Sequence, residues 1–196
     1  MTRVVLATRN HHKVTELRRI LADAPIELLS GLDLDLPEVE ETGDTFAANA
    51  LLKAEACVAA TGLPAVADDS GLVVDALGGE PGARSARYAG EDADDESNLR
   101  LVLERLGAAR QRSARFVCVA ALAMPGGGHI TEEGVMEGVL TDAPRGDGGF
   151  GYDPIFVAVG QQRTNGELTP DEKDAISHRG AAFRALRPHL VALTTA

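Results

Sequence analysis

Apolar residues occur along this chain in runs whose spacing changes from segment to segment, and the spacing predicts the elements. A continuous apolar run within residues 3–8 is typical of a short buried strand. The apolar positions that follow have helical spacing, at Val14, Leu17, Ile20 and Leu21. A second strand is expected at residues 26–29. The chain therefore opens as strand, turn, helix and strand.

The next segment predicts a long helix and then a hairpin. Residues 45–60 are rich in alanine and leucine and contain no proline or glycine, so we expect a helix there, capped by Asp44 or Thr45. Residues 63–68 read as a strand that ends in the polar sequence 68–71, with residues 72–75 as its hairpin partner.

The second half of the chain favours more strands. We expect a helix at residues 94–106 and strands at 115–124 and 130–140, joined by a glycine turn. Residues 142–151 form a glycine-rich functional loop, and a helix at 177–193 is expected to bend or break near Pro188. Early alternation of strands and helices followed by clustered strands predicts an α/β fold with a mixed sheet, in one domain over residues 1–196.

Composition narrows the classes of partner. The formal net charge is −11, which argues against general nucleic-acid binding, and no run approaches the length of a membrane span. A small anionic ligand remains compatible if cations gather locally, together with a divalent metal. Cys57 and Cys118 both lie in apolar stretches, as reduced core thiols do, so we expect a cytoplasmic protein.

The first candidate site is the turn before the first helix, which reads Thr8, Arg9, Asn10, His11, His12 and Lys13. A helix N-terminus offers unpaired N–H groups to an anion. Lys13 opposes the helix dipole there, so its position makes sense if a phosphate binds. The alternative is that Asn10 only caps the helix and Lys13 is solvated. The two histidines, as neighbours in a surface turn, suggest no individual role.

The second candidate site is acidic. Asp68 and Asp69 follow an apolar strand, and Glu38, Glu40 and Glu41 occupy an earlier loop. Mg²⁺ takes one or two carboxylates together with water and phosphate oxygens, and a neighbouring carboxylate can deprotonate the attacking water. Acidic loops are often only solvated, so the aspartate pair carries the stronger signal.

The third candidate site combines an aromatic residue between glycines with later cations. Phe150 can stack on a nucleobase because its flanking glycines let a flat ligand approach. His178 and Arg179 follow the helix cap Ser177 and again place cations where the dipole favours anions. A ligand would compensate them; the structural alternative pairs Arg179 with Asp171 or Glu172.

Together these residues resemble the inosine/xanthosine triphosphate pyrophosphatases of the Ham1 or RdgB type. The resemblance is carried, in order along nearly the whole chain, by Thr8-x-Asn10-x-x-Lys13, Glu40-Glu41-Thr42-Gly43, Ala67-Asp68-Asp69-Ser70-Gly71-Leu72, Ala76-Leu77-Gly78-Gly79-x-Pro81-Gly82, Ser85-Ala86-Arg87-Tyr88, Gly149-Phe150-Gly151-Tyr152-Asp153-Pro154 and Ser177-His178-Arg179-Gly180.

The resemblance implies an elongated, two-lobed fold with a central mixed sheet, a homodimer, and a nucleotide cleft between the lobes. It also implies Mg²⁺-dependent hydrolysis of ITP, dITP and XTP to the monophosphate and pyrophosphate, which removes these nucleotides before incorporation into DNA or RNA. No nucleic-acid or membrane partner is expected.

The resemblance further assigns roles. Residues 8–13 and Lys53 would bind the triphosphate, Glu40 or Glu41 together with Asp69 would bind Mg²⁺, and Asp69 would accept the proton of water with support from Asp68. Ser70 would touch the substrate. The base pocket would contain Phe150, Gly151, Tyr152, Asp153, Lys173, His178 and Arg179.

Two departures from the family pattern stand out. The family often carries glutamate at Ala48 and glycine at Arg9. The first puts a carboxylate role on that helix in doubt, and the second adds a cation beside the phosphate-binding turn. Two other functions stay open at this point: a Maf-like pyrophosphatase with a different base preference, and a nucleotide-binding regulator without turnover.

Overall fold

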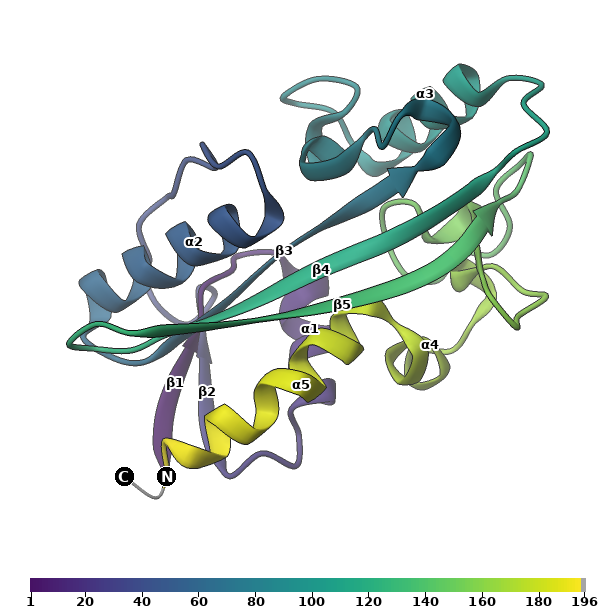
Figure 1. Cartoon of the computed structure of the whole chain (residues 1–196). Helices are drawn as coiled ribbons and strands as arrows, with labels where there is room; N and C mark the ends of the chain where they lie inside the picture. The colour runs from purple at the N-terminus through teal and green to yellow at the C-terminus, as the bar shows by residue number, and fades with distance from the viewer. Residues whose placement is uncertain (195–196) are drawn as a thin grey trace. The chain divides into compact units, whose positions relative to one another are not determined.

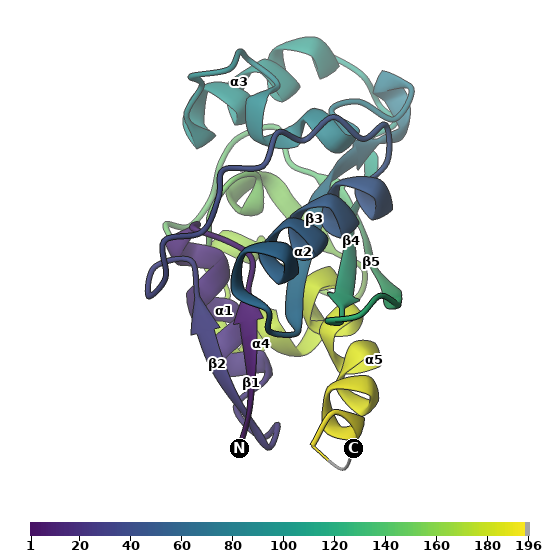
Figure 2. The same ribbon diagram turned by 90° about the vertical axis from the view of Figure 1, so that its left-hand side faces the viewer.

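The computed structural model of the protein describes residues 1–194 and contains a six-stranded sheet in the order β2-β1-β3-β4-β5-β6 (Figure 1). Its strands are β1 (Thr2–Leu6), β2 (Ile26–Ser30), β3 (Ala65–Val74), β4 (Ser113–Ala123), β5 (His129–Leu140) and β6 (Phe156–Ala158). Strand β1 runs parallel to β2, beside which it lies in Figure 2, and parallel to β3, whereas β5 and β6 are antiparallel. The predicted mixed sheet is confirmed.

The described residues form five α-helices and four 3-10 helices. The α-helices are α1 (His11–Ile20), α2 (Phe46–Thr61), α3 (Asp95–Leu106), α4 (Pro170–Ile176) and α5 (His178–Ala192). The 3-10 helices are η1 (Asp75–Leu77), η2 (Gly82–Arg87), η3 (Asp153–Ile155) and η4 (Asn165–Glu167). Within residues 1–194, none of the helices has the length and apolar character needed to cross a membrane.

Side-chain caps fix where α1, α2 and α3 begin. The Asn10 side chain accepts a hydrogen bond from the Lys13 N–H, Thr45 caps Ala48 and Asp94 caps Ser97 in the same way. Each cap satisfies one of the N–H groups that a helix leaves unpaired at its start. Thr45, rather than Asp44, is therefore the cap of α2.

Contacts between residues divide the chain into two compact units. Unit 1 comprises residues 1–69, 118–134 and 179–196, and unit 2 comprises residues 70–117 and 135–178. Strands β3 and β4 contribute residues to both, as does β5, which joins unit 2 at Val135.

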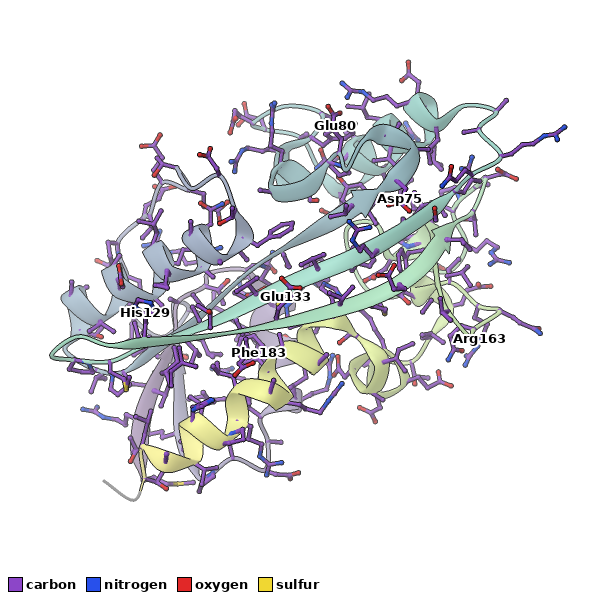
Figure 3. The ribbon with its side chains drawn as sticks, viewed as in Figure 1. Asp75, Glu80, His129, Glu133, Arg163 and Phe183 are labelled. Atoms are coloured by element: carbon purple, nitrogen blue, oxygen red, sulfur yellow. The ribbon has the colours of Figure 1, made fainter. Side chains whose placement is uncertain are left out.

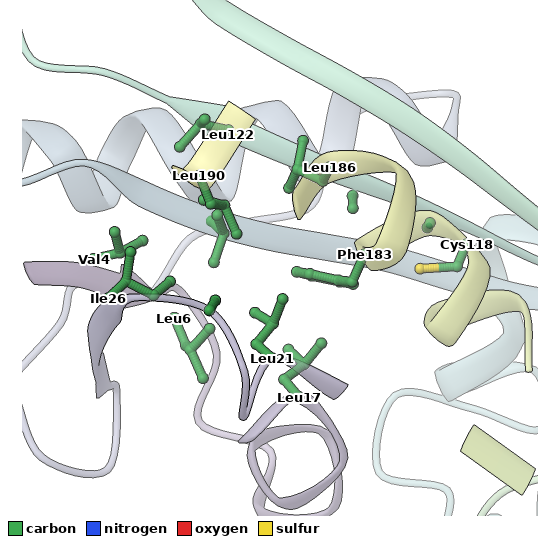
Figure 4. Packing of buried hydrophobic residues seen from close by; sticks show 14 residues of the cluster. Val4, Leu6, Leu17, Leu21, Ile26, Cys118, Leu122, Phe183, Leu186 and Leu190 are labelled. Atoms are coloured by element: carbon green, nitrogen blue, oxygen red, sulfur yellow. The ribbon is translucent and has the colours of Figure 1, made fainter. Parts of the chain in front are cut away.

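In unit 1, alternate residues of β4 enter two different cores because successive side chains of a strand point to opposite faces. One core packs β4 against β1, α1 and α5 (Figure 4). Its members include Val4, Leu6, Leu17, Leu21, Cys118, Ala120, Leu122, Phe183, Leu186 and Leu190. The intervening residues of β4 pack with α2 instead, in a cluster that includes Ala50, Ala54, Ala67, Val119, Ala121 and Ala123.

Unit 2 has its own core, formed between α3 and the strand segments of that unit. It includes Leu72, Val74, Leu99, Val102, Leu106, Phe116, Met136, Leu140, Tyr152, Ile155 and Phe156. Phe116 and Phe156 contact each other with ring centroids 4.6 Å apart. This core supports the loop after β5, which contains part of the candidate site.

The structure differs from the predicted elements in three places. Residues 65–74 form one strand instead of a strand and a hairpin partner, so Asp68 and Asp69 lie inside β3 and not at its end. Both are buried, and cations from other elements balance their charge, which the local sequence does not reveal. Helix α5 continues through Pro188 without a break, and α4 was not foreseen, although Pro170 at its start and the Thr169 cap are ordinary helix signals.

The core of unit 1 leads to a prediction about stability. Leu186 is fully buried on α5, so Leu186→Ala should lower the free energy of unfolding by about 2–5 kcal/mol because it leaves a cavity. Leu52→Ala, the same change at a residue that is 37% exposed on α2, is the matched control and should have little effect. Urea denaturation checks both variants, and equal midpoints would contradict this description of the core.

Candidate functional site

Two adjacent carboxylates in the middle of β3 form the centre of the candidate site. Asp68 and Asp69 are 2% and 5% exposed. As neighbours on a strand, they point to opposite faces of the sheet. Asp68 consequently meets side chains from α1 and α5, and Asp69 meets side chains from α2.

Asp68 lies in a buried cluster with two cations. Its Oδ2 is 3.0 Å from Lys13 Nζ and 3.1 Å from Arg179 Nη2. The other side of the Arg179 guanidinium contacts Glu16, with Nη1 2.5 Å from Oε2. Burial alone would raise the pKa of Asp68, but Lys13, Arg179 and Lys53 outweigh it and hold the pKa well below its usual range. Asp68 is therefore a permanently ionised group.

Asp69 is in a different environment. Its Oδ1 is 3.2 Å from Lys53 Nζ, and that ammonium is also 2.8 Å from Glu41 Oε1. Burial raises the pKa of Asp69; Lys53 opposes this shift and the nearby Glu41 carboxylate adds to it. Of the two aspartates, Asp69 is thus the one whose affinity for a proton is increased.

Asn49 connects Asp69 to the acidic loop. Its Nδ2 donates to Asp69 Oδ2 at 3.2 Å, and its Oδ1 accepts from the Gly43 N–H at 2.8 Å. A Cβ on Gly43 would lie 2.6 Å from Asn49 Oδ1, so this loop position requires glycine. Asn49 therefore holds the loop in a position in which Glu41 contacts Lys53. The Glu40 side chain is exposed. The structure favours Glu41 over Glu40 as a partner of Asp69.

The turn before α1 presents polar groups to solvent. Thr8 Oγ1 accepts from the Asn10 N–H, and His11 and His12 are exposed. Arg9 donates to the Leu36 carbonyl and lies 3.8 Å from Asp35. Its guanidinium therefore contacts the loop after β2.

Lys13 and Arg179 have protein carboxylates as partners. The sequence argument assigned the compensation of these first-turn cations to a ligand, but Asp68 and Glu16 balance them within the protein. The structural alternative expected an acidic partner for Arg179, and the partners in the structure are Asp68 and Glu16, whereas Glu172 pairs with Arg163.

In unit 2, three of the predicted base-pocket residues come together. Asp153 Oδ2 accepts from Lys173 Nζ at 2.5 Å and from the Phe150 N–H at 2.9 Å. The Lys173 ammonium also lies over the Phe150 ring, 4.9 Å from its centroid. Gly149 is essential to this arrangement, because a Cβ there would lie 2.2 Å from Asp153 Oδ2. We call Phe150, Asp153 and Lys173 the aromatic–lysine cluster.

The other predicted base-pocket residues have contacts of their own. Tyr152 is buried in the core of unit 2, and its hydroxyl donates to the Ser85 carbonyl at 2.7 Å. The Gly151 N–H donates to Asp95 at the start of α3. The His178 ring stacks on Phe116 at 4.7 Å, and Arg179 belongs to the Asp68 cluster. Ser70 follows Asp69 in β3 and is partly exposed.

Sequence reasoning missed Glu16, Asn49 and Asn165. A signal existed for two of them. Glu16 interrupts the apolar face of α1 three residues after Lys13, and Asn49 lies four residues before Lys53, so each shares a helix face with a predicted site residue. Asn165 lies in η4, where the local sequence gives no indication of its contact with Asp153.

Removing the guanidinium tests the buried cluster around Asp68. Arg179→Met should destabilise the protein by about 3–5 kcal/mol, because Asp68 and Glu16 would remain buried without it. Arg163→Met is the control, since Arg163 pairs with Glu172 at the surface (Figure 3) and its loss should change stability little. Thermal unfolding measures both variants, and a fully stable Arg179→Met protein would disprove the role of this cluster.

The chain is similar in sequence and in structure to known proteins of one family. The chain is 58% identical over 194 residues to a dITP/XTP pyrophosphatase of Streptomyces coelicolor, with 96% of each chain covered, and 52% identical to one of Geobacter sulfurreducens, with 97% of each covered. The solved structure of a HAM1 protein from Coxiella burnetii superposes with a TM-score of 0.87 at 46% identity over 100% of both chains. The model of the Ham1 family matches residues 4–189. The chain belongs to the Ham1 family.

Proposed function

We propose that this protein hydrolyses non-standard purine nucleoside triphosphates, namely ITP, dITP and XTP, to the nucleoside monophosphate and pyrophosphate. Relatives that are 52–58% identical over nearly their whole length bear the name dITP/XTP pyrophosphatase. The activity removes these nucleotides before they are incorporated into DNA or RNA.

The observation that carries this proposal is the contrast between Asp68 and Asp69. Asp68 lies between Lys13 and Arg179, whereas its neighbour Asp69 shares the Lys53 ammonium with Glu41. Burial and these charges shift the two pKa values in opposite directions. Two carboxylates separated in this way can take different roles, one as a fixed charge and one as a proton acceptor. Asp68 is the fixed charge, and Asp69 is the proton acceptor.

The chemistry at Asp69 is an attack of water on the α-phosphorus. Asp69 accepts a proton from the water as its oxygen bonds to phosphorus. The bond from the α-phosphorus to the bridging oxygen breaks, and pyrophosphate leaves with that oxygen. Lys13 and Lys53, both near the aspartates, attract the phosphate oxygens, and the polar turn formed by Thr8, Asn10 and the start of α1 adds hydrogen-bond donors.

The donor chemistry around Asp69 fits Mg²⁺. Glu41 and Asp69 both contact one cation, the Lys53 ammonium, and two carboxylates are the usual protein share of a Mg²⁺ site. No group of three or more His, Cys, Asp or Glu side chains within residues 1–194 is arranged to hold a metal. Glu41 and Asp69 would hold the ion, and water and phosphate oxygens would complete its coordination. When bound, Mg²⁺ neutralises phosphate charge.

The aromatic–lysine cluster is assigned to recognition of the base. Phe150 offers a ring for stacking, and the ammonium of Lys173 can donate to the 6-oxo group of hypoxanthine or xanthine. Adenine has an amino group at that position, which offers Lys173 a donor where it needs an acceptor. A site that depends on such a contact discriminates strongly against the wrong partner. The homodimer and the cytoplasmic location stay predictions.

The proposed activity is tested by measuring pyrophosphate release from a panel of nucleoside triphosphates with Mg²⁺. ITP, dITP and XTP should be cleaved much faster than ATP, and Asp69→Asn should reduce kcat by about 10²–10⁴-fold because the proton acceptor is lost. Asp142→Asn, the same change at a side chain that is 92% exposed, should retain activity. Equal cleavage of all purine triphosphates would refute the selectivity, and full activity of Asp69→Asn would refute its role.

The choice between the two glutamates gives a separate prediction. Glu41→Gln should raise the Mg²⁺ concentration needed for half-maximal activity by about 10-fold or more, whereas Glu40→Gln should leave it unchanged. Isothermal titration of each variant with Mg²⁺ and a non-hydrolysable ITP analogue adds a readout that does not depend on turnover. If Glu40→Gln shows the larger effect, the assignment of Glu41 is wrong.

A further inference from the structure

Asn165 is a buried amide that contacts the aromatic–lysine cluster. Its side chain is 0% exposed, and its Nδ2 donates to Asp153 Oδ1 at 3.2 Å. We propose that Asn165 is a positioning residue for base selectivity: it fixes the Asp153 carboxylate, and Asp153 in turn holds the Lys173 ammonium where a 6-oxo purine is distinguished from adenine. This inference rests on the proposed function.

The two oxygens of Asp153 have different partners. Oδ2 accepts from Lys173 Nζ and from the Phe150 N–H, while Oδ1 accepts from Asn165. The terminal torsion of an aspartate is broad, so each additional contact narrows the range of orientations that the carboxylate can adopt. The bond from Asn165 restrains the second oxygen as well as the first. The carboxylate restrained in this way holds the Lys173 ammonium that lies over Phe150.

Asn165 can restrain Asp153 because the residues on either side of it, Thr164 and Gly166, are hydrogen-bonded to other parts of unit 2. The Thr164 N–H donates to Glu167 Oε2 at 2.7 Å, and the Thr164 hydroxyl donates to the Arg145 carbonyl at 2.6 Å. The Gly148 N–H donates to the Gly166 carbonyl at 2.9 Å. The short helix η4 is therefore tied to the loop that leads into Phe150.

Glycine makes that close packing possible. A Cβ on Gly166 would lie 2.9 Å from the Arg145 carbonyl oxygen and 3.0 Å from Pro154 Cα. A Cβ on Gly146 would lie 2.2 Å from the Gly166 carbonyl oxygen. Little space remains for η4 to shift, so Asn165 and Asp153 keep their relative positions.

The Asn165 side chain forms its hydrogen bond to Asp153 through the NH2 group of the amide. Within residues 1–194, Asn165 Oδ1 accepts no hydrogen bond although it is buried. A buried acceptor without a donor is unfavourable, and an apolar residue at position 165 would avoid it. What the apolar residue would lose is the hydrogen bond to Asp153. The reverse orientation of the amide would set its oxygen against a carboxylate, so the Nδ2 contact is the favourable one.

The consequence concerns selectivity more than turnover. The phosphate end of ITP and that of ATP are the same, and the residues around Asp69 act on both alike. In the proposed function, the contact of Lys173 with the base distinguishes them. Without Asn165, the Asp153 carboxylate would be held by one oxygen only, and Lys173 would be positioned less precisely. The contact with the 6-oxo group would then weaken, while the already poor reaction with ATP would change little.

The experiment compares kcat/KM for ITP and for ATP in Asn165→Leu and in the wild type. We expect the ratio of kcat/KM for ITP to kcat/KM for ATP to fall by about 10-fold, which corresponds to the free energy of one hydrogen bond. The fall should come from a lower kcat/KM for ITP. Gln162→Leu makes the same chemical change at an exposed amide nearby and should keep the wild-type ratio. A folded Asn165→Leu protein with the wild-type ratio would overturn the proposal.

A second pair of variants covers the case in which leucine disturbs folding. Asn165→Ser and Asn165→Ala have similar size, but only serine retains a donor. A ratio for Asn165→Ser that is closer to the wild type than that of Asn165→Ala supports the proposal, and equal ratios at equal thermal stability overturn it. If the wild type itself released no pyrophosphate from ITP, the proposed function would fail. A selective wild type with unaltered variants would contradict only the role of Asn165.

Discussion

A carboxylate that is removed from water must be balanced by charges held close to it, and Asp68 imposes this constraint on unit 1. Its side chain is fully buried in β3, and removing a single charge from water costs several kcal/mol unless partners compensate it. Lys13 comes from the first turn of α1, and Arg179 comes from the first turn of α5. The packing of both helices against β3 is therefore also the condition for keeping Asp68 ionised.

The same strand gives Asp69 its different character. Because neighbouring residues point to opposite faces, a single step along β3 moves from a carboxylate enclosed by cations to one that shares Lys53 with Glu41. Asn49 then fixes the orientation of Asp69 through a helix that contributes no charge other than Lys53 to this group. The contrast in pKa between the two aspartates thus arises from strand geometry and from what each face of the sheet carries.

The sequence predicted well where the signal was local. Strands β4 and β5 and helices α2 and α3 follow from apolar spacing and from caps such as Thr45 and Asp94, and they were predicted within a few residues. The polar run from Asp68 to Gly71 misled because its composition is that of a turn. Its partners, Lys13 and Arg179, are far away in the sequence, so only the tertiary structure reveals that the strand continues.

The candidate site divides in the same way. The residue types around Asp69 and in the segment 149–153 were sufficient to predict candidate sites. In unit 1 the structure brings Glu41, Lys53 and Asp69 together. In unit 2 it brings Phe150, Asp153 and Lys173 together. The sequence alone did not predict which partner each side chain contacts. Arg179 and Tyr152 were predicted to bind the base, and their contacts in the structure, with Asp68 for Arg179 and within the core of unit 2 for Tyr152, had no signal in the local sequence.

The alanine-rich contact between α2 and the sheet acts as a spacer of fixed and minimal thickness. Ala50 and Ala54 on the helix meet Ala67, Ala121 and Ala123 on the strands. Methyl groups on both surfaces let the helix backbone come close, and the short side chain of Asn49 can then reach Asp69. A larger residue in place of Ala50 or Ala54 would move the helix away from the sheet, so these small side chains determine whether the hydrogen bond from Asn49 to Asp69 can form.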